Sequence, residues 1–160
     1  MRILNPYINY GILFWGNSTY SEDIFKIQKK ALRNLAGLKA RETCRQKFSE
    51  IGIFTAANLY IYKCLLYMHE NKSKYHTNTE NDKQPHLLRH KNVRQLQCSN
   101  NTIYKSFVNT AIKLYNTLNN SLKTETNINR FKKIVKTHYL GNEYYNLGEY
   151  LEICGNQNIK

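Results

Sequence analysis

The sequence predicts an all-α chain made of two small helical subdomains joined by a long polar loop. Only two prolines and seven glycines occur in 160 residues, so long helices are seldom interrupted. Apolar residues recur three and four positions apart instead of alternating, which indicates helices rather than strands. The stretch 71–101 lacks this periodicity. We therefore expect a helical subdomain over 1–70, a flexible polar linker over 71–101, a second helical subdomain over 102–154 and a frayed tail over 155–160.

The N-terminal segment favours a short helix over residues 6–15. Pro6 suits the first turn of a helix, because the N–H that it lacks would be unsatisfied there. The residues from Ile8 to Trp15 are largely apolar, and Gly16 follows as a helix terminator. We expect this helix to be mostly buried because of its apolar character. It is not expected to cross a membrane, since the apolar run is far shorter than the ~20 residues that span a bilayer.

A longer amphipathic helix is predicted from Glu22 to Leu35. Ser21 precedes it as an N-cap, and Glu22 and Asp23 suit the positive first turn, while Gly37 suits the C-terminal end. At 100° per residue its apolar side chains share one face, with Ile24, Ala31 and Leu35 at the centre and Phe25, Ile27 and Leu32 at the flanks. Four cations fall on the opposite face: Lys26, Lys29, Lys30 and Arg33.

Two further helices complete the first predicted subdomain. A short one covers 43–50 and ends at Gly52. The next covers 56–69, with Thr55 as its N-cap. It is apolar on every side, because Lys63 is the only charged residue between positions 56 and 68. A helix of this kind lies at the centre of a bundle or against a partner.

The C-terminal subdomain is predicted to contain three helices. The first keeps an apolar stripe from near Thr102 to Leu118. The second begins at about Asn127, and Asn142 caps a last short helix over 143–152.

No catalytic or metal-binding constellation is found in the sequence. Two-metal chemistry needs carboxylates held close together, but the acidic residues are few and scattered, and a helix N-terminus explains the pair Glu22–Asp23. The four cysteines form no C-x-x-C motif, so we expect reduced thiols and no zinc site. His86 and His90, with Cys98 and His76 nearby, are weak candidate metal ligands, and solvated loop side chains are the preferred interpretation. We expect no cofactor and no metal.

The net charge of +13 and the pI near 9.6 favour polyanionic partners such as nucleic acid. Codon bias is an alternative explanation, since the abundant Lys, Asn, Ile and Tyr all have A/T-rich codons. One cluster is more specific, because it gathers eight cations against a single acid within 22 residues. We predict that this cluster contacts nucleic-acid backbone phosphates. Its members are Lys26, Lys29, Lys30, Arg33, Lys39, Arg41, Arg45 and Lys47.

Several motifs follow one another in a distinctive order. They are YGILFWG at 10–16, IQKKALR at 27–33, CRQKF at 44–48, IGIFT at 51–55, LYIYKC at 59–64 and IKLYNTL at 112–118. This succession resembles the region just after the polymerase palm in reverse transcriptases of jockey-like non-LTR retrotransposons. The likeness covers about residues 6–152 and is strongest in the first 70, although Asn119 replaces a proline that is usual in the family.

The resemblance implies a thumb-like, helical part of an RNA-directed DNA polymerase. In that family the thumb side holds the template–primer duplex, and the paired aspartates of the palm lie upstream. The chain is therefore expected to be a catalytically incomplete fragment, not an enzyme, that binds RNA–DNA or DNA duplex with low sequence specificity. We expect a nuclear or cytoplasmic protein that is not secreted and has no membrane partner. Two alternatives stay open: an interaction module that self-associates or docks on an intact polymerase through helix 56–69, and an inert transposon relic.

Overall fold

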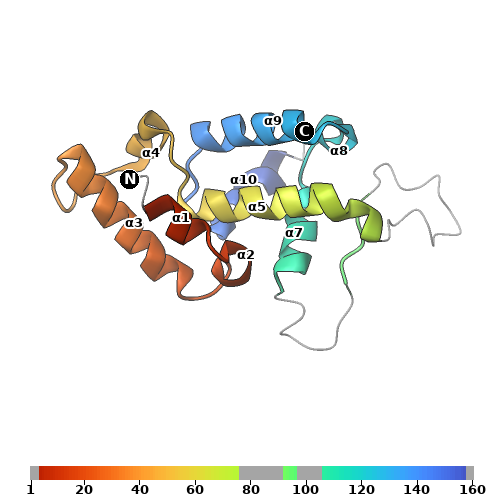
Figure 1. Ribbon diagram of the computed structural model, residues 1–160, viewed down its shortest axis with the longest axis horizontal. Helices are drawn as coiled ribbons and strands as arrows, with labels where there is room; N and C mark the ends of the chain where they lie inside the picture. Colours follow the sequence, from red (N-terminus) through yellow and green to blue (C-terminus); the bar gives the residue numbers. More distant parts are fainter. Residues whose placement is uncertain (1–3, 76–91, 97–105, 158–160) are drawn as a thin grey trace, which may run out of the picture. The chain divides into compact units, whose positions relative to one another are not determined.

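The computed structural model describes residues 4–75, 92–96 and 106–157, and the regular elements in these ranges are helices (Figure 1). The all-α prediction is therefore confirmed. In chain order the elements are α1 Leu4–Asn9, α2 Ile12–Trp15, α3 Ser21–Ala36, α4 Arg45–Ile51, α5 Ala56–Asn71, the 3₁₀ helix η1 Lys72–Lys74, α7 Phe107–Asn116, α8 Asn120–Thr124, α9 Ile128–Gly141 and α10 Leu147–Gln157.

The chain forms two compact units, and the first is built from both ends of the sequence. Unit 1 comprises Met1–Lys63 and Lys133–Lys160, and unit 2 comprises Cys64–Lys132. Helices α5 and α9 are each divided between the two units, because the boundaries fall within them. The predicted division into 1–70 and 102–154 follows chain order, whereas in the structure the C-terminal residues belong to the same unit as the N-terminal ones. Buried hydrogen bonds between the start of α5 and the α9–α10 connection explain this grouping.

The N-terminal segment forms two short helices instead of the single helix predicted over 6–15. Gly11 has a φ of +62°, a left-handed conformation that separates α1 from α2. Ile8 and Ile12 are buried against the rest of unit 1. Three aromatic side chains of this segment are instead largely exposed: Tyr7 (76%), Tyr10 (85%) and Phe14 (80%). The expectation of a mostly buried helix is therefore wrong, because only every fourth side chain turns inward.

Helix α3 has the predicted length but buries a different face. Its end at Gly37, with a φ of +65°, is as predicted. Ser21 is not the N-cap, because its hydroxyl donates to the Ser18 carbonyl (2.7 Å) and Tyr20 precedes the helix. The buried residues are Phe25, Gln28 and Leu32, not the predicted Ile24, Ala31 and Leu35. Phe25 and Leu32 pack into a core cluster with Cys44, Phe48 and Ala56, and this packing sets the rotation of the helix.

Helices α4 and α5 follow their predictions closely. Gly52 ends α4 with a φ of +70°, and Thr55 caps α5 by accepting a hydrogen bond from the Asn58 amide (3.0 Å). The apolar character of α5 on every side corresponds to burial. In unit 1, Tyr60 and Ile61 are at most 1% exposed. In unit 2, Cys64, Leu65 and Met68 are fully buried.

Three buried polar side chains hold unit 1 together. Gln28 on α3 accepts a hydrogen bond from the Ala56 amide (2.9 Å) and donates to the Phe54 carbonyl (2.8 Å), which joins α3 to the start of α5. Thr55 donates to the Tyr144 carbonyl (2.7 Å). Asn58 binds three main-chain groups of residues 139–144. The α9–α10 connection is thus anchored on α5 by groups that would otherwise be unsatisfied in the core.

In unit 2, asparagines on α7 hold the segment 92–96. Asn116 accepts from the Val93 amide (3.0 Å) and donates to its carbonyl (2.9 Å). Asn109 forms the equivalent pair with Leu96 (2.9 and 3.2 Å). These side chains act as a neighbouring strand would, so this part of the predicted flexible linker is attached to the helix. The remainder of the predicted linker after residue 75, including His76, His86, His90 and Cys98, lies outside the described residues.

The last helices differ from the prediction at their starts. A short helix, α8, which the sequence analysis did not identify, follows Asn119, whose side chain caps it. Helix α10 begins at Leu147 rather than at position 143, and Asn146 accepts from the Glu149 amide (2.8 Å). Asn142 does not cap this helix, since its amide donates back to the His138 carbonyl (2.9 Å). The cap lies later because the main chain of Glu143 and Tyr144 is held by Arg45 of α4 and by Thr55 and Asn58 at the start of α5.

Candidate nucleic-acid interface

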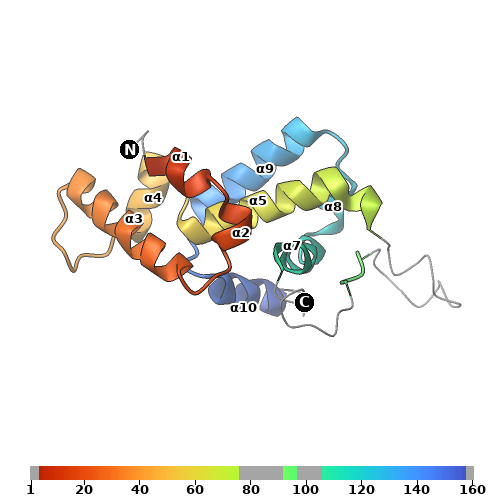
Figure 2. The same ribbon diagram turned by 60° about the horizontal axis from the view of Figure 1, so that its bottom comes forward.

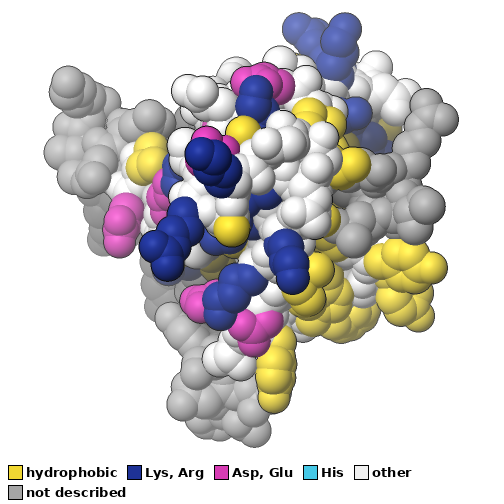
Figure 3. Space-filling model, turned by 90° about the vertical axis from the view of Figure 1, so that its left-hand side faces the viewer, with side chains coloured by type: hydrophobic (Ala, Val, Ile, Leu, Met, Phe, Trp, Pro, Cys, Tyr) yellow, Lys and Arg dark blue, Asp and Glu magenta, His cyan; other side chains and the backbone are white. Residues whose placement is uncertain are grey.

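The predicted cationic cluster lies on α3, α4 and the turn between them, all within unit 1. Helices α3 and α4 lie side by side in both ribbon views (Figures 1 and 2). Glu42 organises the turn, because its carboxylate accepts from the Lys39 amide (2.6 Å) and its carbonyl accepts from Arg33 Nε (2.9 Å). Lys39 and Arg41 are exposed as a result. Figure 3 views this end of the molecule and shows several Lys and Arg side chains with acidic ones between them.

Two of the eight cations form exposed ion pairs within their own helices. Lys26 Nζ lies 2.8 Å from an Asp23 oxygen, and Lys47 pairs with Glu50 one turn along α4. The hydrogen bond and the charge of Asp23 raise the pKa of Lys26. Pairs between such exposed side chains contribute little free energy and are readily exchanged for another anion. Lys26 is exposed and therefore stays available to a phosphate group at reduced net charge, whereas Lys47 is half-buried in its pair with Glu50 and is left out of the surface.

Arg45 has a different environment from the other seven. Its guanidinium donates to the Glu149 carboxylate (2.7 Å) and to the Glu143 carbonyl (2.9 Å), and it lies 4.1 Å from the centroid of the Tyr145 ring. Burial on its own would raise the pKa of Glu149, but hydrogen bonds from Arg45 and from the Tyr145 amide lower it. The same hydrogen bond, donated to Glu149, raises the pKa of Arg45. Arg45 thus joins α4 to α10, and its charge is already matched.

Lys29 also faces inward in part. Its ammonium lies 4.6 Å from the centroid of the Phe25 ring and 5.3 Å from that of Tyr145. A cation over an aromatic face is stabilised where it stands. The predicted surface is therefore reduced to a core of five cations on one side of unit 1. These are Lys26, Lys30, Arg33, Lys39 and Arg41.

This arrangement can neutralise phosphates but cannot read bases. The span from Lys26 to Arg33 is about 10 Å along the helix axis, at 1.5 Å per residue. Long flexible cations at this spacing suit backbone contacts, whereas specificity needs side chains held against base edges. Acidic residues Glu22 and Asp23 bound the surface at the N-terminus of α3 and limit it to the later turns.

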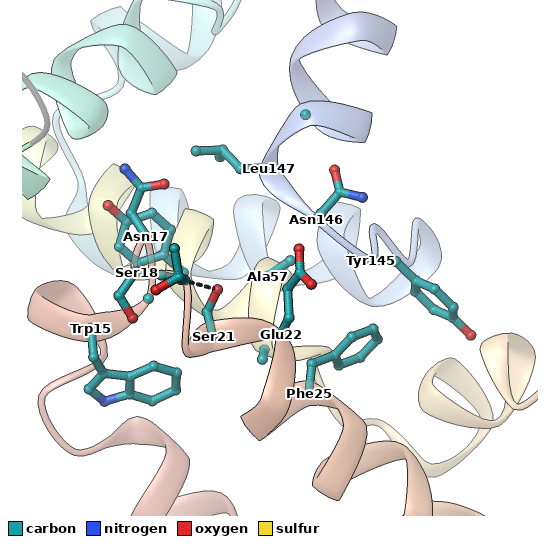
Figure 4. A pocket seen from close by; sticks show the side chains of 15 residues that line it. Trp15, Asn17, Ser18, Ser21, Glu22, Phe25, Ala57, Tyr145, Asn146 and Leu147 are labelled. Carbon is teal, nitrogen blue, oxygen red and sulfur yellow. Dashed lines mark hydrogen bonds between the residues drawn. The ribbon is translucent and has the colours of Figure 1, made fainter.

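A cavity of about 350 Å³ lies between the α2–α3 connection and the start of α10 (Figure 4). In Figure 4 the Glu22 side chain extends from α3 toward Asn146, and Ser21 is bonded to Ser18 below them. Phe25, Ala57 and Tyr145 form its apolar wall. Because Glu22 brings negative charge to this space, the cavity does not extend the phosphate-binding surface.

Within the described ranges, no three His, Cys, Asp or Glu side chains are placed to share a metal ion. Among the cysteines that the structure describes, Cys44, Cys64 and Cys154 are not in disulfide bonds. No single helix of the described residues is long and apolar enough to cross a membrane, although α4 with α5 and η1, bent by 55°, would qualify by length and composition alone.

Comparison with known proteins identified no matching family, no matching curated protein and no matching solved structure. The likeness to reverse transcriptases therefore stays a prediction that rests on the motifs. The structure gives several of those motifs a role in the fold, since Gln28, Thr55 and Cys44 are all buried and contact other helices.

Sequence reasoning did not separate binding cations from structural ones. Arg45 and Glu149 are 104 residues apart, and no local pattern pairs them. The sequence around Glu149 contains an aromatic and acidic run at 144–150, which does not by itself indicate a contact with Arg45. Helical periodicity placed Lys26 and Lys30 on the exposed side of α3 correctly, whereas Arg33 is half-buried beside Glu42. The apolar Ile27 and Leu35 of the same helix are exposed as well.

Proposed function

We propose that this chain binds the phosphate backbone of nucleic-acid duplexes, without sequence specificity, through the surface of Lys26, Lys30, Arg33, Lys39 and Arg41. In this proposal it is a thumb-like part of a non-LTR retrotransposon reverse transcriptase that contributes grip on a template–primer duplex and catalyses no reaction. The motif order described above supports the family origin, and the exposed cations support the binding.

One observation carries the proposal: these five cations are grouped on α3 and on the turn that follows it, within unit 1. Cations scattered by codon bias would be distributed over the whole surface, and a cation held in part-buried contacts between helices, as Arg45 is, would not attract a phosphate. Each phosphate neutralised by such a group releases bound counterions, so the logarithm of affinity falls with the logarithm of salt by about 0.9 per contact on duplex DNA. Five contacts would give a slope of roughly −4.5.

The test is a salt series of duplex binding with a localised charge reversal. The variant Lys30→Glu/Arg41→Glu removes two exposed cations whose side chains are not needed for the core. Fluorescence anisotropy with a labelled RNA–DNA duplex should show a slope smaller by about 1.8 in magnitude, together with weaker binding at every salt concentration. Circular dichroism of the same samples checks that the helical content is kept.

The matched control is Lys133→Glu/Lys136→Glu, which changes the net charge equally at two exposed positions of α9 in the same unit. We expect the slope of this control to stay within about 0.5 of wild type, because these groups contact no phosphate in the proposal. If the two variants lose affinity and slope equally, binding is a property of net charge and the local surface is wrong. A folded wild-type chain that fails to bind at low salt would favour the inert relic.

The alternative function is a protein-interaction module. The helix that was predicted to contact the partner, 56–69, corresponds to α5. The apolar side chains of α5 are mostly buried within the two units. The most exposed large apolar side chains of unit 1 lie instead in its N-terminal part, on α1, α2, α3 and the connections between them. An interaction function for this protein would use that surface.

A further inference from the structure

An apolar groove runs between α1, α2 and α3 in unit 1. Its volume is about 490 Å³, and its lining is almost entirely apolar. Helices α1 and α2 lie along one side of α3 in both ribbon views (Figures 1 and 2). Figure 3 shows hydrophobic side chains gathered at one edge of the same end of the molecule, beside the cations. The residues that line the groove include Tyr7, Tyr10, Phe14, Ile24 and Ile27.

Helix α3 carries a second apolar stripe, of which Ile24 and Ile27 line the groove and the later members continue along the helix beyond it. Ile24, Ile27, Ala31 and Leu35 recur three and four residues apart, so they share one side of the helix. The core uses a different stripe, that of Phe25 and Leu32. Ile27 and Leu35 are 61% and 58% exposed, which is unusual for aliphatic side chains that follow a helical period. A helix with two apolar stripes, one of them uncovered, has the form of an interface helix.

The exposed area is large enough for a stable interface. At their exposures the three aromatic side chains of α1 and α2, together with Ile27 and Leu35, present roughly 600–700 Å² of apolar surface. Monomeric proteins seldom expose a single apolar patch beyond about 300–600 Å². Two such patches in contact would bury up to about 1,300 Å², which is within the range of specific protein interfaces.

We propose that two copies of this chain associate through this groove, with their α3 helices antiparallel and Ile27 near the two-fold axis. Acidic residues lie in the first turn of α3 and cations in its later turns. An antiparallel pair therefore places Asp23 of one copy opposite Lys30 of the other, twice, by symmetry. The same arrangement opposes the two helix dipoles favourably. This self-complementary order of charges favours a second copy over a uniformly acidic partner helix.

Sedimentation velocity over a concentration series tests the proposal. The wild-type chain should sediment as a dimer at about 100 μM and dissociate on dilution, as expected for a micromolar dissociation constant. The variant Tyr10→Ser/Ile27→Gln removes two apolar side chains that are 85% and 61% exposed, so the fold does not depend on them. It should weaken association by at least about tenfold, the effect of removing interface anchor residues.

The matched control is Ile134→Gln/Ile153→Gln. These isoleucines are 39% and 42% exposed on α9 and α10 of the same unit, and neither lines the groove. Its association should equal that of wild type. Equal weakening in both double variants would show general stickiness of apolar residues and would overturn the proposal.

A charge swap tests the antiparallel arrangement. Asp23→Lys and Lys30→Asp should each weaken association severalfold, and the combination of the two should restore it, because each contact then has opposite charges again. A restored dimer is difficult to explain unless these two residues meet across the interface. If the loss of association free energy in the combined variant equals the sum of the losses in the two single variants, the antiparallel arrangement is wrong.

Two further outcomes would overturn the proposal. If the wild-type chain stays monomeric at all concentrations, a second copy does not bind in the groove. Quenching of tyrosine fluorescence by a single-stranded oligonucleotide, lost in the Tyr10→Ser/Ile27→Gln variant, would identify the occupant of the groove as nucleic-acid bases stacked on the aromatic rings. Sedimentation is measured without nucleic acid, so this test does not depend on the duplex-binding proposal.

Discussion

Replacing Asn58 by alanine should destabilise unit 1 more than any other single polar substitution on α5. The side chain is fully buried. Its amide donates to the Tyr139 carbonyl (2.7 Å) and to the Asn142 carbonyl (2.8 Å), and its oxygen accepts from the Tyr144 amide (3.2 Å). Alanine leaves these three main-chain groups without a partner in a region that has little access to water. The chain from α9 to α10 then loses its main attachment to α5.

The size of the effect follows from those three groups. A buried donor or acceptor left unsatisfied costs about 1–3 kcal/mol, and local relaxation or an entering water recovers part of this. We therefore expect the free energy of unfolding to fall by about 3–5 kcal/mol, a large share of the 5–15 kcal/mol typical of a domain. Asn58→Leu should be comparably destabilising despite its apolar character, because it leaves the same groups unpaired. The control Asn34→Ala is at an exposed position of α3 and should stay within about 0.5 kcal/mol of wild type.

Urea denaturation measures these differences. Trp15 is the only tryptophan and belongs to unit 1, so its fluorescence reports on that unit, while circular dichroism follows all helices. Coincident transitions would justify a two-state treatment of the free energies. A loss below about 1 kcal/mol for Asn58→Ala would refute the reasoning, since the three main-chain groups would then be satisfied in some other way.

Two further substitutions probe the two units separately. Burial, and then the charge of Lys72, lower the pKa of His69 from its usual 6.5, so the unfolded state binds more protons and unit 2 should lose stability as the pH falls below about 6.5. Denaturation at pH 7.5 and 5.5 should show this loss, at most about 1.4 kcal/mol per pH unit, and His69→Phe should remove it; an unchanged pH dependence in the variant would contradict the assignment. In unit 1, a Cβ on Gly16 would overlap the Tyr60 ring, so Gly16→Ala should cost about 1–3 kcal/mol in thermal unfolding. Gly141→Ala, where no atom lies within 4 Å of the added carbon, is the control, and an equal effect of both would argue against overpacking.

The positions of most helices could be predicted because they depend on local signals. Gly37 and Gly52 adopt left-handed conformations that glycine accepts without strain, and both end their helices where the sequence indicated. Thr55 caps α5 through a hydrogen bond that spans three residues. These signals need only neighbouring residues, and the sequence contains them in full.

The packing of those helices depended on contacts that no local pattern contains. The buried face of α3 was misplaced because Ile24, Ile27 and Leu35 form as good an apolar stripe as Phe25 and Leu32. Which of the two stripes is buried depends on the helices that pack against α3, and periodicity carries no information about those helices. The same holds for buried polar groups, since the partners of an asparagine can be main-chain atoms far along the chain, and main-chain atoms have no sequence signature.

The two proposed surfaces are neighbouring arcs of one helix, and that has a functional consequence. Around α3 the order is a buried arc with Phe25, a cationic arc with Lys30 and an uncovered apolar arc with Ile27. An antiparallel pair that covers both apolar arcs places Lys30 of each copy opposite Asp23 of the other, and leaves Lys39 and Arg41, which follow the C-terminal end of α3, at opposite ends of the interface. Association and phosphate binding would then reinforce each other, because one duplex in contact with a dimer meets two cationic surfaces instead of one. A protein that grips nucleic acid weakly as a monomer would gain affinity from such pairing without any new contact to the bases.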